Sequence, residues 1–144
     1  MPRLTFPFLP DGLLVPALVG LGAAEMQSLL AQGKPLPPPL HVRGQLDSGS
    51  TITAVAPWLL SALNAVPGPI AQTQTVTGNV SVRFYQISFT IYHLGGGAVL
   101  HRGDWTVTNL IENPDDVDIL YGLDLHREIV VTIDGPGQSF SLDF

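Results

Sequence analysis

The chain has 144 residues, a length typical of one domain, and 45% of them are hydrophobic whereas only 12% are Asp, Glu, Lys or Arg. The net charge is −6 and the six basic residues are scattered, so no basic patch exists that could bind nucleic acid. The absence of cysteine excludes disulfides and thiolate metal sites. So little charge is compatible both with surface hidden in an oligomer and with a compact β domain whose surface is polar.

No apolar run reaches the length of a membrane-spanning segment. Pro7 and Pro10 interrupt the first apolar stretch, where a signal peptide would need an unbroken one. We therefore expect a soluble cytoplasmic protein with no membrane partner and no nucleic-acid partner.

The first forty residues predict a hairpin, a helix and an extended connection. Thr5–Leu9 and Leu13–Leu21 are β-prone, and the turn residues Pro10-Asp11-Gly12 between them indicate an opening hairpin. Ala23–Gln32 has helical spacing of its apolar residues and ends at Gly33. The proline-rich run Lys34–Leu40 is typical of an extended surface segment.

The middle of the chain predicts a strand, a short helix and one long strand of uneven pattern. His41–Leu46 is the strand, and Ala56–Leu63 is the helix, with Trp58 expected in the core. Between Val80 and Tyr92 the alternation of apolar residues changes phase at Phe84-Tyr85. Either a bulge or bend lies there, or the strand serves two different surfaces.

The remaining elements are mostly strands. Val99–Leu110 is a strand region, Ile119–Gly122 is a short buried run and Leu123–Glu128 is a helical turn. Ile129–Ile133 and Ser139–Phe144 form a final hairpin. Because strands dominate, the predicted class is all-β with one or two short helices, in a single domain covering residues 1–144.

One segment combines an acid with small and hydroxyl side chains, Asp47-Ser48-Gly49-Ser50-Thr51. A carboxylate that follows an apolar strand is costly to bury unless donors surround it, and here hydroxyls and close-lying backbone N–H groups are available. Held in this way, Asp47 could activate a water as a general base. On these residues alone, an ordinary Asp-Ser-Gly turn, in which Asp caps the next N–H groups, is the favoured explanation.

The same five residues resemble the Asp-Thr/Ser-Gly-Ala/Ser-Thr/Ser signature of the aspartic proteases. Downstream, Asp118–Leu125 ("DILYGLDL") resembles that family's apolar-apolar-x-Gly segment, and the closing "REIVVTIDGPGQSFSLDF" resembles the final helical turn and hairpin of its single-domain members. From about Leu40 to Phe144 the chain is thus similar to a retropepsin-like aspartic protease of the bacterial and retroviral type. The resemblance implies a retropepsin-like closed barrel that forms a two-fold homodimer.

The resemblance also implies roles for individual residues. Asp47 would be the catalytic carboxylate, paired with the partner subunit's Asp47 so that the two carboxyls share a proton and hydrolyse a peptide or protein substrate without cofactor or metal. The other site residues are implied to support the loop that bears it: Ser48 bracing the dimer axis, Gly49 allowing the tight turn, Ser50 beside the carboxylate, Thr51 completing the signature, and Ile119, Leu120 and Gly122 beneath the loop.

The flap, a hairpin that closes over substrate in this family, best fits Thr73–Val82 with Gly78 at its tip. Apolar substrate subsites would then include Val80, Val82 and Ile119. Residues 22–39 have no counterpart in small members and are an insertion, and Tyr121 is bulkier than expected next to a catalytic loop.

Other polar groups give weaker signals. The four histidines have no metal-ligand spacing, and the carboxylates of Glu112–Asp118 are typical of a solvated acidic loop rather than a Ca²⁺ loop. The leading hypothesis is therefore an aspartic endopeptidase that is active as a homodimer. The alternatives are a non-catalytic dimerisation or peptide-binding module of the same fold, and a monomer or precursor whose cleft never assembles.

Overall fold

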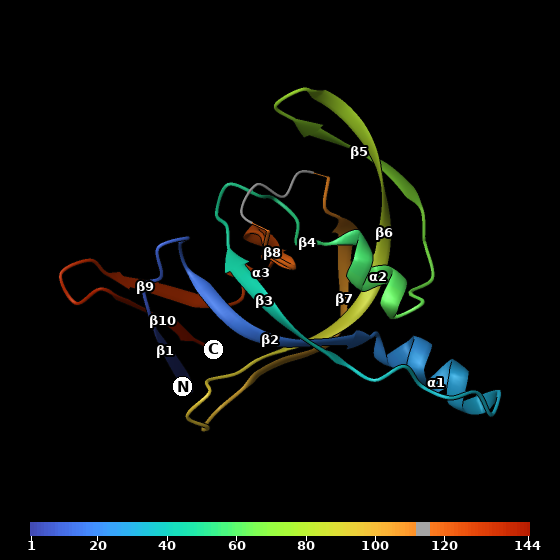
Figure 1. Ribbon diagram of the computed structural model, residues 1–144, viewed down its shortest axis with the longest axis horizontal. Helices are drawn as coiled ribbons and strands as arrows, with labels where there is room; N and C mark the ends of the chain where they lie inside the picture. The colour runs from blue at the N-terminus through green and yellow to red at the C-terminus, as the bar shows by residue number, and fades with distance from the viewer. Residues whose placement is uncertain (112–115) are drawn as a thin grey trace.

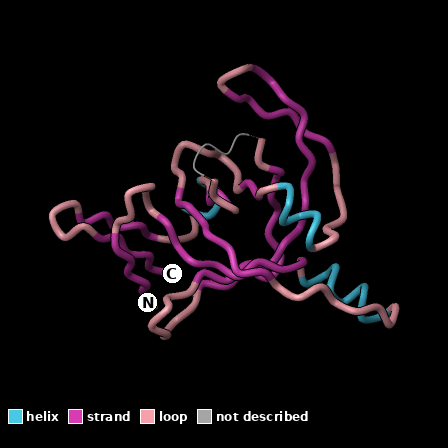
Figure 2. Tube along the Cα trace, viewed as in Figure 1, coloured by secondary structure: helices cyan, strands magenta, loops and turns pink. Residues whose placement is uncertain are grey.

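The computed structural model describes residues 1–111 and 116–144. Their strands and helices follow in the order β1 (Arg3–Pro7), β2 (Leu14–Leu21), α1 (Ala23–Ala31), β3 (Leu40–Leu46), β4 (Ala54–Val55), α2 (Pro57–Ala62), β5 (Ile70–Thr75), β6 (Gly78–Ile91), β7 (Leu100–Asn109), β8 (Ile119–Tyr121), α3 (Leu123–His126), β9 (Val130–Asp134) and β10 (Ser139–Asp143). The predicted class, mostly β with short helices, is confirmed (Figures 1 and 2).

Six of the described strands close a barrel in the order β2-β3-β8-β4-β7-β6, because β6 pairs back onto β2. β5 extends the sheet beyond the barrel by pairing with the first part of β6. Closure leaves no free edge among the barrel strands and encloses a core of aliphatic and aromatic side chains. The largest of these are Tyr121, Phe89, Ile87, Ile91, Leu100 and Ile119.

A second sheet of three strands, ordered β1-β10-β9, stands beside the barrel and brings both termini together (Figure 1). The predicted opening hairpin is therefore wrong: β1 pairs with β10, and only a Leu9–Gly12 bridge joins the two arms of the expected hairpin. The reason lies in the core, where the rings of Phe6 and Phe140 stack at 5.4 Å. The predicted closing hairpin, β9 with β10, is confirmed.

An ion pair joins the neighbouring strands β1 and β10 of this second sheet, where Arg3 lies opposite Asp143. The Arg3 guanidinium donates to both oxygens of Asp143, at 2.7 and 2.9 Å. This hydrogen-bonded pairing lowers the pKa of the Asp143 carboxyl and raises the pKa of Arg3.

The three helices are on the outside of the barrel. α1 agrees with its predicted range and ends at Gly33, which has a φ of +68°. None of its residues is buried, so it covers little of the core. In the described chain, no helix has the length and apolar character needed to cross a membrane.

α2 also agrees with its prediction, and Pro57 occupies its first turn. Leu59 and Leu63 are fully buried, but Trp58 is 53% exposed, so its expected place in the core is wrong. Helical periodicity explains the difference, because residues four apart share a face and Trp58 falls outside the buried one.

β6 is one continuous, curved strand of 14 residues (Figure 1). It pairs with β5 as far as Arg83 and with β7 from Phe84 onward. The change of phase in its sequence therefore marks a strand that serves two surfaces, the second of the two alternatives. A register irregularity does occur, but between Ile87 and Phe89 rather than at Phe84-Tyr85.

Candidate active site

Asp47 directly follows β3, where the chain leaves the barrel. Its backbone N–H donates to the carbonyl of Tyr121 at 2.9 Å, which fixes the start of the loop to the end of β8. The carboxylate is partly exposed, and its Oδ1 accepts the backbone N–H of Gly49 at 2.9 Å. In the described chain Oδ2 has no hydrogen-bond partner, so one oxygen is held by the loop backbone while the other is free to bond elsewhere.

The hydroxyl groups of the segment have other partners than the expected ones. Ser50 Oγ donates to the carbonyl of Ile52 at 2.8 Å, and Ser48 and Thr51 are exposed. None of these hydroxyls is bonded to Asp47. Of the two kinds of donor expected at the carboxylate, the backbone N–H is confirmed by the bond from Gly49, whereas the hydroxyl donors are wrong, because the Asx-type turn places a backbone N–H at the carboxylate.

Gly122 lies directly below this loop. A Cβ on Gly122 would come within 2.7 Å of the carbonyl carbon of Ile52 and 2.9 Å of the oxygen of Ser50. No other residue type leaves room for the backbone here, because real Cβ atoms do not approach backbone atoms so closely. The next residue, Leu123, donates its N–H to that same Ser50 oxygen at 2.8 Å, so β8 and α3 carry the loop between them.

Ile119 and Leu120 lie beside the strand that leads to Asp47. β8 runs parallel to β3, with Ile119 opposite Gly44 and Leu120 opposite Gln45. Ile119 is fully buried in the core and is not open to substrate in the single chain. Val82 is only 3% exposed and lies at the wall of a hollow between α2 and the β5–β6 hairpin. Of the three residues expected to line subsites, only Val80 is partly exposed.

Tyr121 does not crowd the loop despite its size. Its ring lies over Gly44, where a Cβ would come within 2.6 Å of the ring, and 5.1 Å from the ring centre of Phe89. The hydroxyl is buried without a hydrogen-bond partner in the described chain. Burial raises the pKa of this hydroxyl well above its usual range.

A polar cluster below the loop was missed by sequence reasoning. Asp124 Oδ1 accepts the backbone N–H of Thr53 at 3.1 Å and the Thr53 hydroxyl at 2.8 Å, while Oδ2 accepts the indole N–H of Trp105 at 3.0 Å. Thr53 Oγ1 in turn accepts the N–H of Gly122 at 3.2 Å. The sequence did contain one indication of this cluster, since Asp124 is the sole charged residue in the apolar run 119–125.

The hydrogen bonds of this cluster also distinguish the Asp124 carboxylate from the Asp47 carboxylate. Both oxygens of Asp124 are occupied by donors of the loop base and of β7, whereas Asp47 keeps one oxygen free. Across residues 1–111 and 116–144, no group of three or more His, Asp or Glu side chains could hold a metal ion. The acidic segment Glu112–Asp118 lies for the most part outside the described residues.

The predicted flap region is a hairpin. β5 and β6 pair from Ile70–Arg83 to Thr75–Gly78, with Val76 and Thr77 in the turn and Gly78 at a φ of +127° next to it. Val76 is 92% exposed. The hairpin arches above the loop between β3 and β4 in the view of Figure 1.

Comparison with known proteins bears on this arrangement. No protein-family model and no curated protein matches the chain. Among solved structures, the chain is similar to a retropepsin-like aspartic protease from Rickettsia conorii, with a TM-score of 0.60 over 99% of this chain and 91% of that one, at 12% identity. The fold is retropepsin-like.

Proposed function

We propose that the protein is an aspartic endopeptidase that works as a homodimer. The observation that carries the proposal is the asymmetry between two acids: Asp124 has both oxygens occupied, and Asp47, which is partly exposed, has one oxygen without a hydrogen-bond partner in the described chain. A single chain thus supplies one usable carboxylate at the site. Peptide hydrolysis needs a base for water and an acid for the leaving amine, so a second carboxyl must come from another copy.

The reaction follows from two carboxyls that share one proton, since like charges about 3 Å apart cannot both ionise. The ionised carboxylate takes a proton from water while the water oxygen bonds to the peptide carbonyl carbon, and the protonated carboxyl gives its proton to the carbonyl oxygen, which forms a gem-diol. The carboxyl that gained the water proton then gives it to the amine nitrogen as the C–N bond breaks, and one hydroxyl of the gem-diol returns its proton to the other carboxylate, which leaves a carboxylic acid product and the shared proton in place. Activity at acid to mildly acidic pH is expected from such a pair.

The exposed surface around the loop supports assembly of two copies. Ser48 and Gly49 are exposed, and Ile52 is 38% exposed on the same loop. Pairing of two such loops would cover apolar and backbone groups that are open in the single chain. The β5–β6 hairpin would then serve as the flap over bound peptide.

The test is cleavage of an unstructured peptide library from about pH 4 to about pH 7. We expect the wild type to cleave and Asp47→Asn to lose activity by about 10³-fold or more, because removal of the acid–base group removes the chemical step. Asp104→Asn is the matched control, since Asp104 is an exposed carboxylate on β7. Sedimentation should give a dimer.

Equal cleavage by wild type and Asp47→Asn would contradict the proposal. A stable dimer that cleaves nothing at any pH would instead favour the non-catalytic dimerisation or peptide-binding module.

A further inference from the structure

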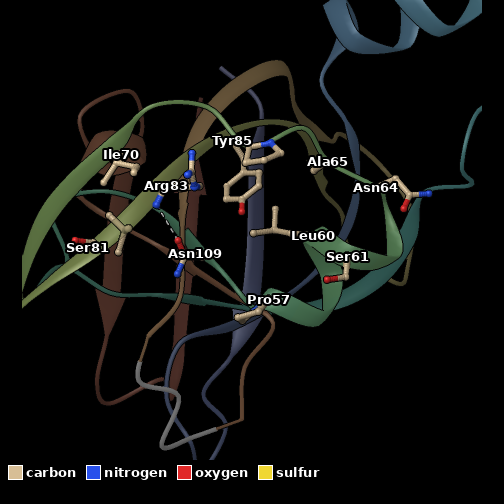
Figure 3. A pocket seen from close by; sticks show the side chains of 12 residues that line it. Pro57, Leu60, Ser61, Asn64, Ala65, Ile70, Ser81, Arg83, Tyr85 and Asn109 are labelled. Atoms are coloured by element: carbon tan, nitrogen blue, oxygen red, sulfur yellow. Dashed lines mark hydrogen bonds between the residues drawn. The ribbon is translucent and has the colours of Figure 1, made fainter.

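A hollow of about 730 Å³ lies between α2 and the base of the β5–β6 hairpin. Figure 3 shows Leu60 of α2 on one side of it and Arg83 and Tyr85 of β6 on the other. None of its lining residues belongs to the loop 47–53, so it is separate from the candidate active site. The hairpin forms one wall of the hollow.

The charge in this hollow comes from Arg83. One guanidinium nitrogen, Nη1, donates to the carbonyl of Gly68 at 3.1 Å, which holds the group in place. In the described chain Arg83 has no carboxylate partner. Three other arginines do have one, in the pairs Arg3–Asp143, Arg43–Asp11 and Arg102–Glu128. The Arg83 guanidinium is therefore a cation whose remaining N–H groups can donate to a ligand.

Further donors surround Arg83. The backbone N–H of Arg83 donates to Asn109 Oδ1 at 3.0 Å (Figure 3). Because that N–H can only donate, the amide oxygen must face it, and the two N–H groups of Asn109 are left for another partner. The hydroxyl of Tyr85 points toward Leu60 and the hydroxyl of Ser61 lines the same hollow. Among the described residues that line the hollow, none is Asp or Glu.

The rest of the wall is apolar. Leu60 and Ile70 are among its apolar residues, and Ile70 is 60% exposed. A single small anion on Arg83 would leave the apolar residues of the wall uncovered. A peptide that carries an acidic and an apolar side chain would contact both Arg83 and these apolar residues. In a protein of net charge −6, a hollow whose described lining carries an arginine and no acid is a local exception that favours an anionic occupant.

We propose that this hollow binds an acidic peptide segment, with a Glu or Asp carboxylate on Arg83 and a neighbouring apolar side chain against Leu60 and Ile70. Arginine suits this role because its planar fork can donate two parallel hydrogen bonds to one carboxylate. Binding here does not require that the protein cleave peptides, so the inference stands apart from the proposed function.

The test uses two matched probes, acetyl-Ala-Leu-Glu-Leu-Ala-amide and the same peptide with Gln in place of Glu. Each is titrated into ¹⁵N-labelled Asp47→Asn protein, in which the peptide stays intact, and binding is followed by NMR. We expect the Glu peptide to bind about tenfold more tightly than the Gln peptide, which corresponds to about 1.4 kcal/mol. The side-chain signals of Arg83 and Asn109 should shift during the titration, and added salt should weaken binding.

Two arginine variants locate the interaction. Arg83→Gln should reduce binding of the Glu peptide to the level of the Gln peptide, whereas Arg127→Gln, which removes the same charge from exposed surface after α3, should leave it unchanged. Both positions are exposed, and thermal melting of each variant checks that it is folded. The inference is overturned if neither peptide binds, or if the Glu and Gln peptides bind equally. It is also overturned if Arg83→Gln and Arg127→Gln weaken binding of the Glu peptide to the same extent. Failure of peptide cleavage would not change any of these outcomes.

Discussion

The loop that carries Asp47 and the β5–β6 hairpin are stabilised by different means. The loop makes hydrogen bonds to two other elements: β8 through Tyr121, and α3 through Leu123 and Asp124. The hairpin beyond the barrel is stabilised mainly by its own ladder, and Val76 at its turn is 92% exposed. A site that must hold a carboxylate in place and also admit a substrate needs one fixed part and one part that opens.

A glycine in each region provides the sharpest comparison. Gly122 has an ordinary φ of −87° but no space for a Cβ, whereas Gly78 has ample space but a φ of +127°. The first is required by packing and the second by backbone conformation. Substitution of each by alanine therefore separates the two regions.

The largest effect is expected for Gly122→Ala. A Cβ here would meet backbone atoms of Ile52 and Ser50, which cannot move aside as a flexible side chain can, so the loop must shift. We expect a loss of about 3 kcal/mol in the free energy of unfolding, measured by urea denaturation, together with loss of peptidase activity. The control is Gly135→Ala in the β9–β10 turn, where a Cβ meets nothing within 4 Å. Equal stability of the two variants would mean that the loop is not supported as described.

The second largest loss in the free energy of unfolding is expected for Thr53→Val, which keeps the shape of the side chain and removes its hydroxyl. Thr53 is fully buried, and its loss would leave the N–H of Gly122 without its acceptor and Asp124 with one donor fewer. We expect a cost of about 2 kcal/mol by denaturation. Thr106→Val, at an exposed hydroxyl bonded to Gln86, should cost less than about 0.5 kcal/mol. Similar costs at both positions would contradict the role of the Asp124 cluster.

A smaller effect, of opposite sign, is expected for Tyr121→Phe. The Tyr121 hydroxyl is buried without a partner in the described chain, so its removal takes away a desolvation penalty and leaves the ring packing intact. We expect the free energy of unfolding to rise by about 1 kcal/mol. A clear decrease would show that the hydroxyl has a stabilising partner.

The smallest effect on global stability is expected for Gly78→Ala. The φ of +127° strains any residue with a Cβ, but the hairpin can open without unfolding the barrel. We expect a change below about 0.5 kcal/mol in global stability and faster amide hydrogen exchange within β5 and the start of β6. Gly97→Ala, with a φ of +101° in the turn before β7, is the control and should leave exchange in the hairpin unchanged. A loss of global stability in Gly78→Ala as large as that in Gly122→Ala would contradict the proposed difference between the hairpin and the loop.

Local patterns in the sequence were sufficient for most individual elements. The two longer helices, the closing hairpin and the strand before Asp47 agree with their predicted ranges within a residue or two, since each is determined by periodicity, proline and glycine close at hand. The predicted hairpin at Thr73–Val82 is present for the same reason. The catalytic role of Asp47 and the supporting roles of Ser48, Gly49, Ser50 and Thr51 remain predictions.

Four features depended on the tertiary structure alone. They are the pairing of β1 with β10, the exposure of Trp58, the pairing of β6 first with β5 and then with β7, and the Asp124 cluster. Each depends on residues far apart in the chain, such as Phe6 with Phe140 or Thr53 with Asp124, and sequence periodicity reports only on near neighbours. The sequence by itself determined a β-rich chain in which Asp47 directly follows a predicted strand and precedes Ser48-Gly49. The closed barrel determined that Asp124 has both oxygens occupied and Asp47 only one, because hydrogen-bond partners depend on contacts that form only when the chain is folded.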